Sequence, residues 1–213
     1  MIAKADLRQS GVLRTDPKGS RWWRFHARHL ATPVSTGFVW TAKVEMPLGM
    51  HVRVVDSYVG GTGSGRVSLL SMVPLAAEPG GRELNAGALH RYLAESVWFP
   101  TALLPQSGVA WTGIDERTAL ATLSDGPTTV SLEFRFNDAD EVSAIYSPGR
   151  WARAGKRYRL LPWEGHFDDY REHSGMRIPF YGEVGWYVED KLELVWKGRL
   201  ENASYAFADG RRS

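Results

Sequence analysis

The sequence contains no cysteine among its 213 residues. This absence excludes a disulfide framework, a cysteine-ligated zinc or iron–sulfur site, and a thiol nucleophile. A strong excess of charge is missing as well, because 26 basic residues stand against 24 acidic ones and the formal net charge is +2. So balanced a composition offers no electrostatic argument for nucleic acid, and we expect no nucleic-acid partner.

Long apolar runs are missing too. No stretch reaches the roughly 18 consecutive apolar residues of a membrane-spanning helix, so we expect no membrane span. The first ten residues, MIAKADLRQS, lack the apolar core of a signal peptide, which predicts a cytoplasmic protein. The chain shows no linker, repeat or low-complexity segment, and its length suits one globular domain over residues 1–213.

Aromatic residues are abundant, with nine Trp, eight Tyr and eight Phe. Several lie in stretches where apolar and polar residues alternate, at residues 38–46, 130–137 and 191–197. Alternation with a period of two is typical of strands that have one buried and one wet face. Turn signals rich in Pro, Gly and Asp separate these stretches. We therefore expect a mainly β protein whose antiparallel sheet curls into a barrel or half-barrel.

One stretch in the middle of the chain has a different period. Leu89, Leu93 and Val97 recur every four residues, which predicts a helix over residues 85–99 that ends before the following proline. With a second short helical piece after it, the helical insertion covers about residues 84–105. The class is thus α+β, with strands, one helical insertion and then strands again.

A single helix covers only part of one face of a large curved sheet, so other side chains must occupy its concave side. The surplus of aromatic residues suits either of two arrangements, a bulky core or the lining of a ligand cavity. The residues that we expect to line such a cavity are Trp40, Tyr92, Trp98, Trp111, Trp163, Tyr170 and Trp186.

Three charged residues are the candidates for chemistry. Arg91 and Glu95 lie four apart on the expected helix, where a plain ion pair would contribute only a few tenths of a kcal/mol. Alternatively, Glu95 beside the indole of Trp98 would have a raised pKa and act as a general acid or base, while Arg91 holds an anionic or carbonyl group. Asp115 ends an expected strand and could pair with Glu95 as a second carboxylate, or with Arg91 as a buried ion pair.

Other motifs carry less weight. The glycine-rich residues 60–65 precede a strand pattern rather than a helix, so they predict a turn and not a phosphate loop. His26 and His29 would point to opposite faces of one strand. Residues 168–170 read as a loop or edge strand at the rim of the sheet. The chain has no recognisable metal motif, and we expect neither a metal nor a cofactor.

The segment RYLAESVWFPTALLP at residues 91–105 resembles the hallmark of a bacterial family known only as a domain of unknown function. The resemblance extends from about residue 22 to residue 207. It implies a fold similar to the periplasmic lipoprotein carriers, in which a strongly curved antiparallel sheet forms an open half-barrel with helices on its concave side. It supplies no activity. The rest of the family pattern appears in order at residues 38–42, Asp56, Gly60, Gly61, Trp111, Asp115, Ala119, Pro162, Trp163, Tyr170, Gly175, Pro179 and residues 184–186.

Three hypotheses follow for function. The first is a binding protein that holds an apolar or amphipathic small molecule in an aromatic cavity, with Arg91 and Glu95 fixing a polar end. The second is a cofactor-independent isomerase, dehydratase or cyclase that uses Glu95 or Asp115 as general acid or base in the same cavity. The third is a scaffold with a filled core and no ligand. Fold analogy favours the first.

Overall fold

The structure, a computed structural model, describes residues 1–71, 73–78, 80–154 and 157–208. None of the helices in these ranges has the length and apolar character that a membrane crossing needs.

The described residues form one antiparallel sheet of thirteen strands, in the order β6-β5-β4-β3-β2-β1-β13-β12-β11-β10-β9-β8-β7. Strands that are neighbours in sequence pair with each other, except β6 and β7, and the pairing of β1 with β13 joins the two ends of the chain. The order ends at β6 and β7, so the sheet is not closed into a barrel. The strands are β1 (Ile2–Leu13), β2 (Trp23–Thr32), β3 (Gly37–Glu45), β4 (His51–Val59), β5 (Thr62–Leu69), β6 (Val73–Glu78), β7 (Val109–Asp115), β8 (Thr118–Asp125), β9 (Thr128–Phe136), β10 (Val142–Ala154), β11 (Arg157–His173), β12 (Met176–Val188) and β13 (Lys191–Phe207).

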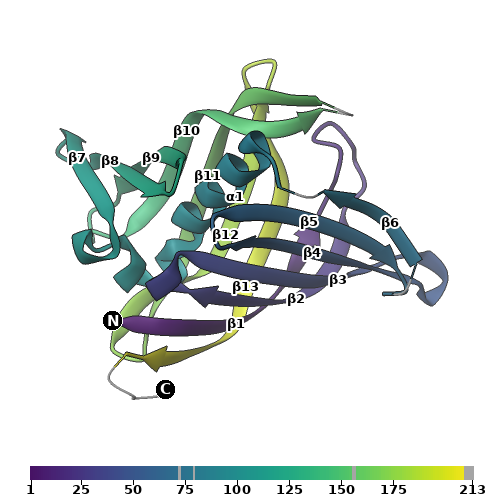
Figure 1. The fold of residues 1–213 in the computed structure, drawn as a ribbon, viewed down its shortest axis with the longest axis horizontal. Coiled ribbons are helices and arrows are strands. Elements are labelled where there is room, and N and C mark those ends of the chain that lie inside the picture. The colour runs from purple at the N-terminus through teal and green to yellow at the C-terminus, as the bar shows by residue number, and fades with distance from the viewer. Residues whose placement is uncertain (72, 79, 155–156, 209–213) are drawn as a thin grey trace.

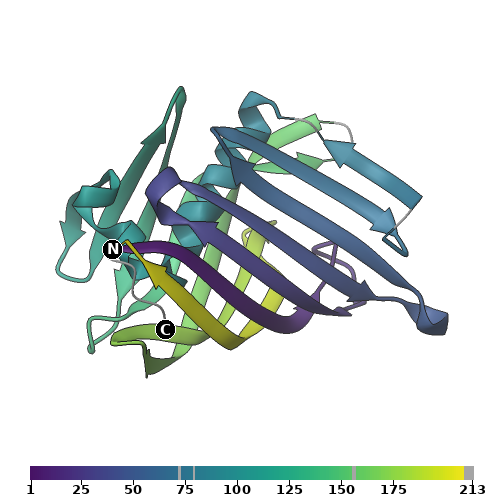
Figure 2. The same cartoon turned by 60° about the horizontal axis from the view of Figure 1, so that its bottom comes forward.

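The sheet is strongly curved, and its α-helix α1 (Arg82–Glu95) lies on the concave side (Figures 1 and 2). The helix packs against β4 and β5 of one half of the sheet and against β9 and β10 of the other half. This arrangement confirms the expected α+β class, an open half-barrel with a central helix. Short 3₁₀ segments complete the helical part: η1 (Pro33–Ser35), η2 (Pro47–Gly49), η3 (Ser96–Trp98), η4 (Pro100–Leu103) and η5 (Pro105–Ser107).

The helix begins earlier and ends earlier than its sequence pattern predicted. The extended backbone of Gly81 precedes it, and Asn85 lies inside the first turns instead of capping them. The side chain of Asn85 accepts a hydrogen bond from the backbone N–H of Gly63 at 2.9 Å, which ties the helix to β5. The segment after Glu95 tightens into η3, and the Ser96 hydroxyl donates to the carbonyl of Tyr92 at 2.8 Å. The second helical piece is present as η4.

The core lies between α1 and the concave face of the sheet. Alternation along β3 buries Phe38, Trp40, Ala42 and Val44, while Lys43 is exposed. The same parity places His26 outside and His29 inside on β2, as the sequence predicted. The glycine-rich residues 60–65 contain the β4–β5 turn, where Gly60 and Gly61 have positive φ angles of 57° and 76°.

Residues 168–170 do not form a loop, because they lie within β11. Asp168 and Tyr170 pair with β12, while the pairing of β11 with β10 ends at His166. The polar character of this segment has another cause. Asp169 has a φ of 58° and is skipped in the pairing with β12, while its carboxylate binds the guanidinium groups of Arg171 and Arg199.

Candidate ligand-binding site

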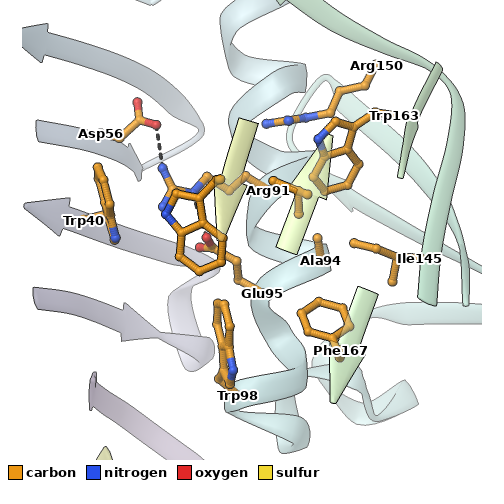
Figure 3. A pocket seen from close by; sticks show the side chains of 12 residues that line it. Trp40, Asp56, Arg91, Ala94, Glu95, Trp98, Ile145, Arg150, Trp163 and Phe167 are labelled. Atoms are coloured by element: carbon orange, nitrogen blue, oxygen red, sulfur yellow. Dashed lines mark hydrogen bonds and ion pairs between the residues drawn. The ribbon is translucent and has the colours of Figure 1, made fainter. Parts of the chain in front are cut away.

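A cavity of about 230 Å³ lies between α1 and the concave face of the sheet (Figure 3). Strands from both halves of the sheet contribute to it, and α1 and η3 form its remaining wall. The lining residues are Trp40, Asp56, Arg91, Ala94, Glu95, Trp98, Ile145, Arg150, Trp163, Phe167, Val184 and Trp196.

Aromatic rings form most of the apolar wall. Trp98 meets Phe167 edge to face at a centroid distance of 5.9 Å and Trp196 at 6.2 Å. The position of Trp98 is fixed by two hydrogen bonds. Its Nε1 donates to the carbonyl of Pro179 at 3.1 Å, and its own carbonyl accepts from the hydroxyl of Tyr205 at 2.7 Å. The wall is therefore held by packing and by buried hydrogen bonds, and it needs no ligand to form.

Three glycines of the sheet lie on or next to the strands that carry Phe167 and Trp196. Gly11, Gly198 and Gly182 lie opposite one another across β1, β13 and β12. A Cβ atom on Gly182 would lie 3.3 Å from both Trp98 and Phe167, and one on Gly198 would collide with the ring of Trp196. We call these three residues the glycine row. Gly182 and Gly198 let the rings of Trp98, Phe167 and Trp196 lie close to the backbone of the sheet, while a Cβ on Gly11 would meet the backbone of β13.

Arg91 is the centre of an ion-pair cluster at one side of the cavity. Its Nη1 lies 2.7 Å from Asp56 Oδ2, and its Nε lies 2.9 Å from Glu95 Oε1. The guanidinium also lies over the rings of Trp40, at 4.8 Å, and Phe38, at 5.2 Å. Although burial works against the charge, Glu95 and Asp56 raise the pKa of Arg91 above its ordinary value. The two carboxylates thus balance the charge of this cation, and the two rings add to its stability.

The second oxygen of Glu95 faces a buried histidine. His29 Nε2 lies 3.5 Å from Glu95 Oε2, and His29 is fully buried. Burial lowers the pKa of His29 to about 4; Glu95 opposes this shift, and Arg91 supports it. The imidazole is therefore neutral at neutral pH, and Glu95 takes its positive partner from Arg91 alone.

Arg150 lies on the opposite side of the cavity, on β10. Its Nη2 donates to the carbonyl of Gly87 on α1 at 3.0 Å. Its guanidinium lies over the rings of Trp163, at 4.5 Å, and Trp186, at 5.3 Å. Burial, opposed in part by nearby carboxylates and helped by Arg91, lowers its pKa to about 10, so it keeps its charge at neutral pH.

Several buried polar atoms of the lining residues have no hydrogen-bond partner within the described part of the chain. They are Glu95 Oε2, Arg150 Nε, Trp163 Nε1 and Trp196 Nε1. Buried polar atoms in folded proteins are nearly always paired, so a cluster of unpaired ones around one cavity calls for a partner inside it.

The structure brings five of the ten predicted site residues to this cavity, namely Arg91, Glu95, Trp40, Trp98 and Trp163. Trp186 lies close by. It lines an adjoining hollow on the far side of Arg150, and that hollow shares Asp56, Arg91 and Arg150 with the cavity.

The other aromatic residues lie elsewhere. Tyr92 is buried against Phe99, with ring centroids 5.7 Å apart, because its neighbouring position on α1 turns it away from Arg91. Trp111 on β7 packs on Phe134 at 5.2 Å, and its Nε1 donates to the carbonyl of Leu103. Tyr170 donates to the carbonyl of Val142 and lines a separate hollow.

Asp115 is the clearest correction. It is exposed at the β7–β8 turn, where its carboxylate accepts the backbone N–H of Arg117 at 2.8 Å. It pairs with neither Glu95 nor Arg91. The pairing of β7 shifts register between Gly113 and Asp115, so a regular alternation along this strand does not give the orientation of Asp115.

Sequence reasoning missed several lining residues. Asp56 shares the inward parity of Val52 and Val54 on β4, and an acid among apolar positions was an available signal. Arg150 carried no such signal, because β10 shifts register between Ser147 and Arg150. Trp196 lay in a recognised strand pattern, but nothing in the pattern indicated that it faces a cavity.

The fold and the site define a mainly β protein with an open, strongly curved antiparallel sheet, a helix on its concave side and an aromatic cavity beneath that helix. The chain belongs to a family of unknown function, DUF6544, whose pattern matches residues 1–198. This match confirms the resemblance to a family of unknown function that residues 91–105 indicated. No functionally curated protein matches the sequence.

Two solved structures are similar to this chain at low identity. A LolA superfamily protein from Nitrosomonas europaea has 10% identity and a TM-score of 0.43, with 94% of this chain and 83% of that chain covered. A beta-barrel-like DUF1849 protein from Brucella abortus has 11% identity and a TM-score of 0.27, with 96% of this chain and 98% of that chain covered.

Proposed function

We propose that the protein binds a small apolar or amphipathic molecule in the cavity beneath α1. The observation that carries this proposal is the combination of aromatic walls with buried polar atoms that lack a partner. A filled apolar core would contain neither the space nor the unpaired atoms.

The size of the cavity limits the occupant. An engineered protein cavity of roughly 150 Å³ accommodates benzene. At about 230 Å³, this cavity suits a single ring with a short substituent, or a short acyl segment. A long lipid chain would have to extend out of it, toward the hollow lined by Trp151 and Trp186.

The first experiment compares native and denaturing mass spectra of freshly purified protein. An additional mass that is present only under native conditions would identify a bound molecule. In parallel, 4-methylbenzamide serves as a neutral probe of the cavity in ligand-observed NMR and calorimetric titrations. We expect it to bind, since its ring matches the apolar wall and its amide can pair with the free polar atoms.

A filled-cavity variant provides the control. Ala94 lines the cavity on α1, so Ala94→Leu should occupy the space and weaken probe binding at least about tenfold. Ala110→Leu introduces the same change at an exposed position of β7 and should leave binding unchanged. Absence of probe binding to the parent protein, together with a clean apo mass, would overturn the proposal in favour of a closed core.

The enzymatic alternative retains one supporting observation. Glu95 lines the cavity and has one carboxylate oxygen without a hydrogen-bond partner in the described residues, so it could exchange a proton with a ligand. Its ion pair with Arg91 favours the binding hypothesis instead, because it fixes the carboxylate in place as a structural contact. Glu95→Gln decides between them. Retained folding and probe affinity with loss of turnover of the co-purified molecule would support the enzyme.

A further inference from the structure

The two arginines of the cavity are in different electrostatic situations. Arg91 is balanced by Asp56 and Glu95 at 2.7 and 2.9 Å. Arg150 has no carboxylate within 4.0 Å among the described residues, and its one hydrogen bond there goes to a backbone carbonyl. A guanidinium has five N–H groups, so most of the hydrogen-bonding capacity of Arg150 remains unused.

The position of Arg150 is also unfavourable for an unpaired charge. Its Nε is buried, and its guanidinium is enclosed by the ring of Trp163, the ring of Trp186 and the helix α1. In Figure 3 its guanidinium extends from the wall above Trp163 toward α1. Ring faces stabilise a cation less than a carboxylate does, so a direct anionic partner would add to the stability of this arrangement.

The unpaired polar atoms around the cavity also favour an anionic ligand. Three of them are donors, on Arg150, Trp163 and Trp196, and one is an acceptor, on Glu95. A ligand that satisfies them must carry more acceptors than donors. A carboxylate has acceptors only and matches the planar fork of an arginine.

Arg150 also lies where the polar end of a bound ligand is expected. It lines both the deep cavity and the adjoining hollow, of about 150 Å³, that contains Trp186. An apolar group placed among Trp98, Trp163 and Phe167 would therefore leave its charged end at Arg150, between the two spaces.

We propose that the ligand is a small apolar carboxylate, with its ring or chain in the cavity and its carboxylate on Arg150. This inference rests on the proposed function and narrows it to a class of ligand. Arg91 is a poorer anchor because Asp56 and Glu95 already balance its charge and would repel a third carboxylate.

The test compares two probes of nearly the same shape, 4-methylbenzoate and 4-methylbenzamide, by calorimetric titration at neutral pH. For the parent protein we expect the carboxylate to bind at least about tenfold more tightly, since a charge-assisted bond to a buried arginine is worth about one factor of ten or more. Arg150→Gln should abolish this preference, because it should weaken binding of the carboxylate at least about tenfold more than binding of the amide. Arg150→Lys should restore part of the preference.

A charge control and a folding control accompany the variants. Arg8→Gln changes the net charge equally but lies on an exposed position of β1, so it should keep the preference. Near-ultraviolet circular dichroism, which reports on the nine tryptophans, should be the same for all variants.

The outcomes separate the two proposals. If both probes bind with equal affinity, or if Arg150→Gln keeps the preference, the carboxylate assignment is overturned and the binding function stands. If neither probe binds to the parent protein and its native mass spectrum shows no bound molecule, the proposed function itself falls, and the carboxylate assignment falls with it.

Discussion

Arg91 Nη1 lies 2.7 Å from Asp56 Oδ2, so an ion pair joins the helix α1 to β4 over 35 positions of sequence. On the other side of the helix, Arg150 of β10 donates to the carbonyl of Gly87. The helix is thus fastened to both halves of the sheet by arginines, one on the helix and one on a strand. The cavity lies directly beneath these two attachments.

Removal of Arg91 should be costly. Arg91→Met leaves Glu95 and Asp56 as two carboxylates without their cation, so we expect a loss of about 3 kcal/mol in the free energy of unfolding. Urea titration followed by tryptophan fluorescence measures this loss. The exposed pair of Arg28 and Asp6 is the matched control, and Arg28→Gln should hardly move the unfolding midpoint. Equal effects of the two variants would contradict a central role for Arg91.

His29 should make the stability depend on pH. Its pKa is about 4 in the folded protein, because of burial, and about 6.5 in an unfolded chain. Between these values only the unfolded chain takes up the proton, so stability is full above about pH 6.5 and falls as the pH drops toward 4. The contribution of this one group is up to roughly 3 kcal/mol.

Urea midpoints at several pH values between 7 and about 4.5 measure this dependence. His29→Asn should flatten the profile in this window, although not completely, because the pKa of His90 is also lowered by burial to about 4. His26 lies on the opposite face of the same strand and is exposed, so His26→Gln should leave the slope unchanged. A slope that His29→Asn does not alter would contradict the assignment.

Gly198 should tolerate no side chain. In Gly198→Ala the new methyl group would collide with the ring of Trp196, which lines the cavity and packs on Phe25 at 5.6 Å. We expect a destabilisation of roughly 1–3 kcal/mol and weaker binding of 4-methylbenzamide, since the ring must move. Gly113→Ala is the control, because a Cβ there meets no atom within 4 Å. Thermal unfolding and probe titration give the two readouts.

Asp115 should be dispensable for binding. It is exposed at the β7–β8 turn and accepts a hydrogen bond from the backbone of Arg117, outside the cavity. Asp115→Asn should therefore change the dissociation constant of either probe less than twofold. A tenfold loss in the same titration would mean that β7 approaches the site in solution.

The sequence predicted the regular parts of this fold well. Alternation identified β3, β9 and β13, and it placed Trp40 on the inner face because β3 pairs with its neighbours without a shift. It also predicted a helix that carries Arg91 and Glu95, although the boundaries differ by three or four residues.

The irregular parts could not be predicted, because a single bulge inverts the parity of every residue beyond it. Arg150 and Asp115 both follow such shifts, and their orientation was missed or wrong. The cavity depends on contacts between residues far apart in sequence, such as Trp98 and Trp196, and no local pattern contains that information.

At the glycine row, the absence of side chains determines how closely the rings of Trp98 and Trp196 approach the sheet. The three glycines lie opposite one another on β1, β13 and β12, and two of them leave room for rings that line the cavity. Glycine in a strand also permits sharp bending, so the residues that make room for the rings are the ones that let the sheet fold around them. The depth of the pocket and the curvature of the sheet should therefore depend on the same residues. In a relative with larger residues at these three positions, we expect the site to become shallower and the sheet flatter together.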